Sequence, residues 1–279
     1  LAAICGATDI LLFIPVREVP RASTAKPPTP ADILVTPWKN TLFRGFALYT
    51  IVSWIAYMMM GPFVWRYCFD PVKKHGLGMS VMEAHVLLTI VPLVAMAWVA
   101  PCWGRAIDRF GPKPVLACSA LFAIVMPFTW VMVHPGMEWI VWVAAVVSGL
   151  TWPGIDQVNF YMTVKGFPDA RRTTYVAAYQ VMMGVANMAG SALGGVCATF
   201  WQHQMHALSF LPGWVSHYQL VFLTAIGLRL AAFLFIFPWM KLQGDANYGT
   251  VARAIANDLT ATLPSGVGTR KWRRNAPER

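Results

Sequence analysis

The amino-acid sequence predicts an all-α polytopic membrane protein whose main part is a bundle of six membrane-spanning helices. Only 12% of the 279 residues are charged and 57% are hydrophobic, whereas a soluble domain has about 25% charged residues. The hydrophobic residues gather in six stretches, each long enough to cross a hydrocarbon core of ~30 Å, which takes about 20 helical residues. The basic residues, which give the chain a formal net charge of +10, lie mostly between these stretches.

The six predicted spans are nearly free of charged residues. Four of them contain no Asp, Glu, Lys or Arg, whereas the fourth holds Asp156 and the sixth holds Arg229. Because a helix satisfies its own backbone hydrogen bonds in lipid, each stretch is expected to be helical. We therefore expect residues 46–240 to form one transmembrane bundle. In chain order the spans cover residues 46–65, 84–103, 115–133, 139–161, 173–201 and 218–240.

The segments that flank the bundle differ from it in composition. Residues 1–16 are apolar but lack the basic start and small-residue cleavage site of a signal peptide. We expect them to be the cytoplasmic end of a preceding span, with most of an N-terminal half missing. Residues 17–45 are rich in Pro, Ser and Thr and predict a cytoplasmic linker between two halves. Residues 241–279 predict a polar, basic cytoplasmic tail, with a short surface helix over 251–263.

The positions of Lys and Arg predict the orientation of the bundle. Of the 22 Lys and Arg residues, 18 lie on one side of the predicted membrane, and only Arg66, Lys73 and Lys74 lie in connections on the other side. Cytoplasmic connections collect Lys and Arg, so the basic side and the C-terminus are expected in the cytoplasm, with a bacterial inner membrane as the location. The same rule accounts for the positive charge without nucleic acid as a partner.

A short basic turn, CWGRAIDRFGPKP, joins the second and third spans. Gly104 and Gly111 are expected to allow a tight turn, and Pro112 suits the first position of a new helix. Asp108 is placed to accept hydrogen bonds from free N–H groups at a helix N-terminus, and Arg109 to pair with an acid on a neighbouring helix. Such a turn can hold helix ends together in one conformation and release them in another.

This turn resembles the signature of the major facilitator superfamily of secondary transporters. The signature, Gly-x-x-x-Asp-Arg-x-Gly-(Arg/Lys)-(Arg/Lys), lies in the cytoplasmic turn after the second helix of each half. The matching residues are Gly104, Asp108, Arg109, Gly111 and Lys113, while Pro112 stands where the family often has a base. The stretches WKNTLFRGFALY, GMSVMEAHVLLTI and FPDARRTTYVAAYQ are similar to the starts of the family's seventh, eighth and eleventh helices.

The resemblance implies the C-terminal half of a twelve-helix transporter, from the end of helix 6 through helix 12. Such a half is built from paired three-helix inverted repeats. It implies alternating-access transport of a small organic solute across a lipid bilayer, possible coupling to a proton or sodium ion, and dependence on the N-terminal half or a partner chain. The turn residues would act as a conformational latch. A non-transporting membrane receptor or scaffold on the same fold is the alternative.

Several aromatic and polar side chains are candidates for a substrate cavity. The family's seventh and tenth helices line its central cavity, which implicates Trp54 and Tyr57 in the first span and Trp152 in the fourth. Each of these aromatic residues can instead serve core packing. Pro153, beside Trp152, is expected to bend or weaken the fourth helix. The remaining cavity candidates are Asp156, Gln180 and Asn187.

The fifth span carries small residues at the spacing that allows close helix packing. Gly190 and Gly194 form a Gly-x-x-x-Gly pair, which Ala186 extends. Small residues let helix backbones approach closely in lipid, so packing is the favoured interpretation. Gln180 and Asn187 lie on the same helix, where they either face a cavity or bond a neighbouring helix.

Asp156 and Arg229 are the two charges inside the predicted spans. An ionisable residue at membrane depth is a functional candidate and ordinarily has a partner. The two positions differ in depth by about 9 Å at 1.5 Å per residue, and a long Arg side chain can cover part of that distance. They form a candidate pair, although Asp156 could instead pair with Arg109. A structural role for Arg229 is favoured, because the last helix of each half is peripheral in the family.

The sequence offers no constellation for catalysis or for a bound cofactor. There is no Gly-x-Ser-x-Gly elbow, phosphate-binding loop or pair of intramembrane His residues, so the chain is not expected to be an enzyme or an ATP-driven pump. The five Cys residues lack the spacing of a metal or redox site. His203 and His206 alone are too weak a pattern to indicate metal, so neither a cofactor nor a metal is expected.

Overall fold

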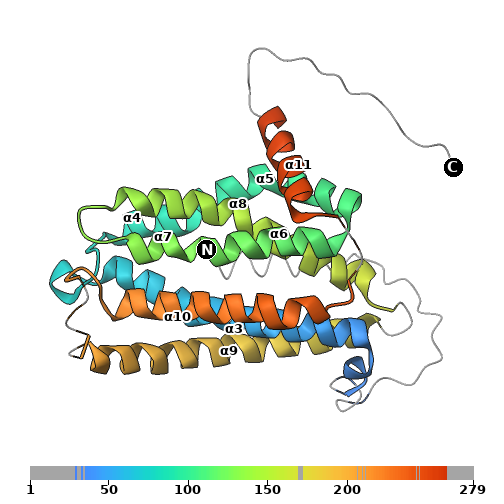
Figure 1. Cartoon of the computed structure of the whole chain (residues 1–279), viewed down its shortest axis with the longest axis horizontal. Helices are drawn as coiled ribbons and strands as arrows, with labels where there is room; N and C mark the ends of the chain where they lie inside the picture. The colour runs from blue at the N-terminus through green and yellow to red at the C-terminus, as the bar shows by residue number, and fades with distance from the viewer. Residues whose placement is uncertain are drawn as a thin grey trace, which may run out of the picture.

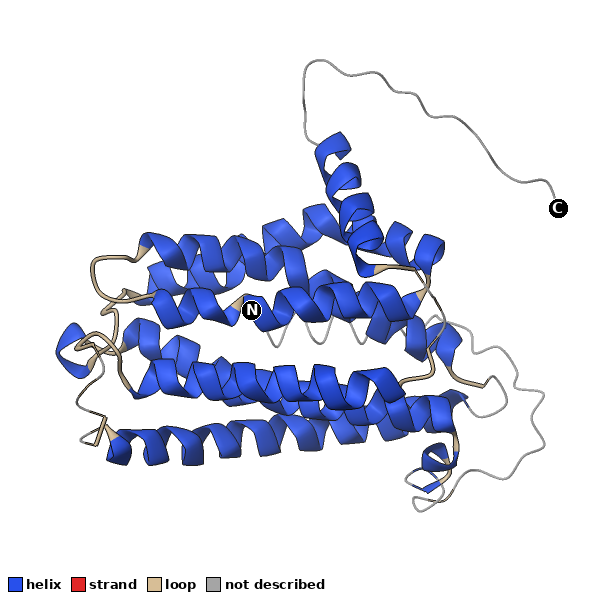
Figure 2. Cartoon of the chain, viewed as in Figure 1, coloured by secondary structure: helices blue, strands red, loops and turns tan. Residues whose placement is uncertain are grey.

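The computed structural model describes residues 29, 33, 35–168 and 172–262, with the exception of 206, 209, 211, 243 and 245. These residues form helices and connecting loops and contain no strand (Figure 2). The partial span expected at 1–16 lies outside the described residues, as do much of the linker and the end of the tail.

Among the described residues, six helical rods are long and apolar enough to cross a membrane, which confirms the predicted all-α polytopic fold and its six spans. Consecutive rods run in opposite directions (Figure 1). In chain order they are α3 (Thr41–Phe69); α4 (Val81–His85), η3 (Val86–Ile90) and α5 (Val91–Phe110); α6 (Pro112–Val125) and α7 (Pro127–Met132); α8 (Trp139–Tyr161) and η4 (Met162–Gly166); α9 (Arg172–Gln204); and α10 (His217–Ala231), η6 (Ala232–Ile236) and η7 (Phe237–Trp239). Short 3-10 turns lie at η1 (Pro37–Lys39) and η2 (Val72–Lys74), and a seventh long helix, α11, covers Tyr248–Thr262.

Capping side chains fix where several rods begin. The Asn40 side chain accepts hydrogen bonds from two backbone N–H groups in the first turn of α3. Ser80 and Glu83 form a capping box at the start of the second rod, and Ser216 and Gln219 form another at the start of the sixth. Each box satisfies backbone N–H groups that have no partner within the helix, so both rods start at defined residues.

The two ends of the bundle differ in charge. We call the end with the α5–α6 turn the turn end and the opposite end the far end; α3 starts at the turn end and α11 lies beside it (Figure 1). The described part of the turn end carries the larger share of basic residues, among them Lys39, Arg44, Arg105, Arg109, Lys113 and Lys165. The far end carries Arg66 in the last turn of α3 and Lys73 and Lys74 in η2.

The rods pack as two related sets of three. The most extensive contacts join α3 to α9 and α5 to α8, and the next join α3 to α10 and α6 to α8. Exchanging the first three rods with the last three maps each of these contacts onto its counterpart. This is the packing expected of two three-helix repeats. Figure 1 shows α3, α9 and α10 in one layer and α5 to α8 in the other.

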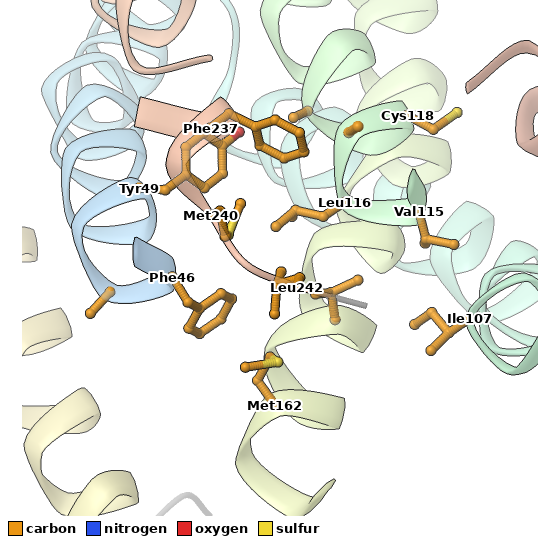
Figure 3. Packing of buried hydrophobic residues seen from close by; sticks show 14 of the residues in the cluster. Phe46, Tyr49, Ile107, Val115, Leu116, Cys118, Met162, Phe237, Met240 and Leu242 are labelled. Carbon is orange, nitrogen blue, oxygen red and sulfur yellow. The ribbon is translucent and has the colours of Figure 1, made fainter. Parts of the chain in front are cut away.

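A large apolar cluster holds the layers together at the turn end. The segment that leaves the sixth rod inserts Met240 and Leu242 between the two layers, where both are buried. Figure 3 shows these side chains between Phe46 and Tyr49 of α3 and Leu116 of α6. Each Å² of apolar surface that is buried stabilises the fold by about 25 cal/mol, which favours this insertion. The chain after the sixth rod is therefore part of the core.

A buried hydrogen-bond network joins α3, α7 and α10 at the far end. The Tyr67 hydroxyl donates to the Val133 carbonyl at 2.6 Å, and the Gln219 side-chain amide donates to the Tyr67 hydroxyl at 2.9 Å. The Tyr218 hydroxyl donates to the Asp70 carboxylate. Buried polar groups with satisfied partners fix one arrangement of the elements that carry them, so this network sets how the far ends of the rods meet.

Candidate functional site

Three predicted cavity residues meet at the centre of the bundle. Trp54 and Tyr57 of α3 contact Trp152 of α8, with ring centroids 6.0 Å and 4.8 Å apart. Trp54 and Tyr57 also contact each other at 5.6 Å, and all three pairs have the edge-to-face geometry that aromatic rings prefer. α3 and α8 are the first rods of the two repeats. The aromatic cluster therefore links equivalent positions of the repeats across the layers.

A cavity of about 180 Å³ opens beside this cluster. Tyr57 and Trp152 line it, together with the polar side chains of Ser148 and Thr151. Most of the remaining lining is apolar and comes from α3, η3 and α5 to α8, for example Met60, Leu87, Pro92, Met126 and Ala145. A concave, mainly apolar surface with a few polar groups is typical of a small-molecule site.

Arg229 of α10 also lines the cavity and lies buried beneath Tyr57, 7% exposed. The centre of its guanidinium is 4.6 Å from the Tyr57 ring centroid, within cation–π range. One terminal nitrogen donates to the Ala123 carbonyl at 2.9 Å. That carbonyl is available because Pro127, four residues on, has no N–H to donate to it. The break between α6 and α7 thus determines one partner of Arg229.

The expected pairing of Asp156 with Arg229 is absent. Asp156 is exposed on α8 and lies outside the cavity lining, and no ion pair joins it to Arg229 or to Arg109 in the described part of the chain. The Arg229 guanidinium is held instead by α3 and α6, through Tyr57 and Ala123. Asp156 follows Trp152 by one helical turn and so shares its face of α8.

Pro153 lies inside α8 without ending it, and the expected bending or weakening at this position stays a prediction. The helix is continuous from Trp139 to Tyr161, and Trp103 of α5 donates its indole N–H to the Leu150 carbonyl at 2.9 Å. The neighbouring glycines serve close packing. A Cβ on Gly149 would lie 2.5 Å from the Pro92 carbonyl oxygen, and one on Gly154 would lie 2.8 Å from the Trp103 ring.

Gly190 and Gly194 of α9 pack against α3, in agreement with the packing role that the sequence favoured. A Cβ on Gly190 would lie 2.6 Å from the Ile55 carbonyl oxygen, and one on Gly194 would lie 2.5 Å from the Met59 carbonyl oxygen. These distances are shorter than any ordinary carbon–oxygen contact, so α9 and α3 can be this close only where the side chains are absent.

The two amide candidates on α9 lie outside the cavity. Gln180 is exposed. Asn187 is partly buried, and among the described residues its side-chain oxygen has no hydrogen-bond partner. The same holds for the buried indole N–H of Trp54. A substrate role for Gln180 or Asn187 stays a prediction.

The signature turn is made by a single residue. Gly111, with φ 85° and ψ 168°, separates α5 from α6, and its N–H donates to the Ile107 carbonyl at 2.9 Å. This backbone conformation is open to glycine and strained for other residues. Gly104, which was expected in the turn, lies instead inside α5, where an added Cβ would meet no atom within 4 Å.

Asp108 and Arg109, the acid and the base of the signature, form no ion pair with any residue that the structure describes. Asp108 is exposed and, contrary to expectation, accepts no hydrogen bond from a helix N-terminus within the described residues. Arg109 lies over the ring of its neighbour Phe110 at 5.0 Å. Lys113, at the start of α6, is half-buried near Tyr248 of α11.

The strongest contacts at this turn come from residues that sequence reasoning did not select. Arg105 of α5 forms an ion pair with Asp258 of α11 at 3.0 Å. Gly244, with φ 112°, passes so close to the turn that a Cβ there would lie 2.5 Å from the Phe110 carbonyl oxygen. The sequence indicated a helix over 251–263 but gave no signal of where it would dock.

Comparison with known proteins agrees with this architecture. The family model described as Major Facilitator Superfamily matches residues 42–261, a range that starts within α3 and ends within α11. No curated protein and no solved structure matches the chain.

Proposed function

The chain belongs to the major facilitator superfamily and is a multi-pass integral membrane transporter of that kind, and on this premise we propose that it performs secondary active transport of a small organic solute by alternating access. In this mechanism two bundles rock about a site near the bilayer midplane. A gradient of the solute or of a coupling ion, a proton or sodium, drives net movement. In this proposal the chain moves the solute across the membrane and neither makes nor breaks a covalent bond.

The observation that carries the proposal is the aromatic cluster over the cavity. Trp54 and Tyr57 come from the first rod of one repeat, and Trp152 comes from the first rod of the other. A solute bound against these rings would have its environment changed when this bundle rocks against the second bundle. Aromatic rings offer a large apolar face to an organic solute at low conformational cost.

The six rods would act as the C-terminal one of two bundles, with the second bundle in the same polypeptide or in a partner chain. Asp108 and Arg109 would latch the turn end when the bundles close there, because both are exposed and neither forms an ion pair within the described residues. The positive-inside rule supports placing the turn end and the C-terminus in the cytoplasm, with a bacterial inner membrane as the expected location.

A test combines binding with transport in proteoliposomes. A thermal-unfolding screen of small organic solutes identifies those that stabilise the purified protein, because a ligand that binds the folded state raises its apparent stability. The stabilising solute is then loaded on one side of the membrane in labelled form. Saturable movement across the membrane supports a transporter. Saturable binding without movement would instead support a receptor on the same fold.

A further inference from the structure

We infer that the cavity beside Arg229 binds an organic anion, a carboxylate attached to a ring-sized apolar group. The inference rests on the proposed transport function, since it names the class of solute that the site would take. It goes beyond that proposal because the sequence favoured a structural role for Arg229 over substrate contact.

No acidic side chain in the described part of the chain forms an ion pair with Arg229. Its terminal nitrogens reach the Ala123 carbonyl at 2.9 Å and the Met60 sulfur at 3.6 Å, both uncharged. Its Nε is buried without a hydrogen-bond partner. Of the described residues that line the cavity, Arg229 alone carries a formal charge. A buried cation without a counter-ion is strongly unfavourable, and the Tyr57 ring compensates only part of that cost.

A carboxylate is the ligand group that best matches this environment. A guanidinium has five N–H donors in a planar fork that matches carboxylate geometry. Charge-assisted hydrogen bonds between the two are about twice as strong as neutral ones. The low polarity of the surrounding cavity strengthens the attraction. Ser148 provides a further hydroxyl donor in the lining, whereas the Thr151 hydroxyl donates to the Val147 carbonyl at 2.7 Å.

The size and lining of the cavity indicate the rest of the ligand. Its volume is about 180 Å³, and an apolar cavity of about 150 Å³ holds a benzene ring. Trp152 and Tyr57 contribute aromatic rings to the lining, and Leu87 and Met126 contribute apolar side chains. The expected ligand therefore places one planar or compact apolar group in the cavity with its carboxylate toward Arg229.

Benzoate and benzamide provide a matched pair of probes. They have the same ring and nearly the same shape, but only benzoate is charged at neutral pH. Isothermal calorimetry on the purified protein should show benzoate binding at least about tenfold tighter than benzamide, as expected when one charge-assisted contact worth ~1.4 kcal/mol is lost. Equal binding of the two probes, or no binding of benzoate, overturns the inference.

Arg229→Gln tests whether this residue supplies the discrimination. We expect benzoate binding to weaken by about tenfold or more and benzamide binding to change little. Arg44→Gln is the control, because it removes an arginine from α3 at the exposed turn end, away from the cavity. Benzoate binding that is unchanged in Arg229→Gln would contradict the role of Arg229.

A second variant covers the case in which Arg229→Gln does not fold. Pro127→Ala gives the Ala123 carbonyl a helical N–H partner, which removes one structural task of Arg229. The double variant Pro127→Ala with Arg229→Gln is then compared with the single variant Pro127→Ala. We expect benzoate to bind the double variant about tenfold or more weakly.

Different results would contradict the anion-site inference and the transport proposal. Benzoate that binds through Arg229 but never crosses proteoliposomes contradicts transport and leaves the anion site standing. Transport of a neutral or cationic solute, by a protein that does not bind benzoate, contradicts the anion site and leaves transport standing.

Discussion

Arg105 on α5 and Asp258 on α11 form an ion pair at 3.0 Å, which joins the helix after the last span to the rod that ends in the signature turn. Both side chains are nearly half exposed, and pairs of this kind contribute only about 0–1 kcal/mol. Apolar contacts strengthen the attachment, because Val251 of α11 is fully buried and Ile255 and Leu259 pack against the core. α11 is therefore docked on the turn end.

Gly244→Ala should release α11 from the turn. The substitution combines a positive φ with a Cβ 2.5 Å from the Phe110 carbonyl oxygen, and such strain costs about 1–3 kcal/mol. Hydrogen exchange of the α11 amides should speed up by about tenfold, the factor for ~1.4 kcal/mol, while the spans keep their protection. Gly249→Ala is the control, since its Cβ would meet only the Asn247 side chain at 3.6 Å. Unchanged exchange in Gly244→Ala would refute the docking role.

Gly111→Ala and Gly104→Ala should separate the two glycines of the signature. Gly111 needs the backbone conformation that only glycine adopts without strain, so its replacement should lower the free energy of unfolding by about 1–3 kcal/mol. Gly104 lies in an open helical position, where Ala is favoured by up to ~1 kcal/mol. Thermal unfolding in detergent should show a lower midpoint for the first variant and an equal or higher one for the second. The opposite order would mean that the turn is not built as described.

Gly190→Ala should loosen the contact between α9 and α3. Its Cβ would lie 2.6 Å from the Ile55 carbonyl oxygen, and overpacking of this kind costs about 1–3 kcal/mol. Gly184→Ala, on the same helix with no atom within 4 Å of the new Cβ, should be as stable as the parent or more stable. Thermal unfolding of the two variants in the same detergent measures the difference. Equal stability would show that close approach at Gly190 is not required.

Asp108→Asn should change the rate of transport more than the affinity for solute. Asp108 is exposed and far from the cavity lining, so removal of its charge leaves the cavity intact while it weakens a latch that forms in another conformation. Initial rates in proteoliposomes should show a lower maximal rate, an unchanged half-saturating concentration and an unchanged unfolding midpoint. A normal maximal rate would exclude the latch role.

Most of the fold follows from properties that the sequence displays directly. Long uncharged segments and capping residues such as Ser80 and Ser216 place the rods. The small residues at 190 and 194 were correctly assigned to close packing, because the membrane offers few other ways to bring helices together. The aromatic side chains of Trp54, Tyr57 and Trp152 were selected as one candidate set, and the structure brings them into contact.

The sequence did not correctly predict which side chains on different helices contact each other. Arg229 was matched to Asp156 because these are the charges within the spans, whereas a carbonyl exposed by Pro127 and the Tyr57 ring hold the guanidinium. A proline four residues after Ala123 was a usable signal for a free carbonyl. The docking of Asp258 on Arg105 had no such signal, because helix position after a polar connection depends on tertiary packing.

The most direct test of the account is transport by the parent protein and by Trp152→Ala in proteoliposomes, with a solute selected by thermal stabilisation. Trp152 contacts the α3 aromatic residues and lines the cavity, so the account predicts saturable uptake by the parent. For the folded variant it predicts half-saturation at a concentration raised by about tenfold or more, as for the loss of one aromatic contact of ~1.4 kcal/mol. Uptake by Trp152→Ala with parental kinetics, or a parent that binds the solute and never moves it, would contradict the account.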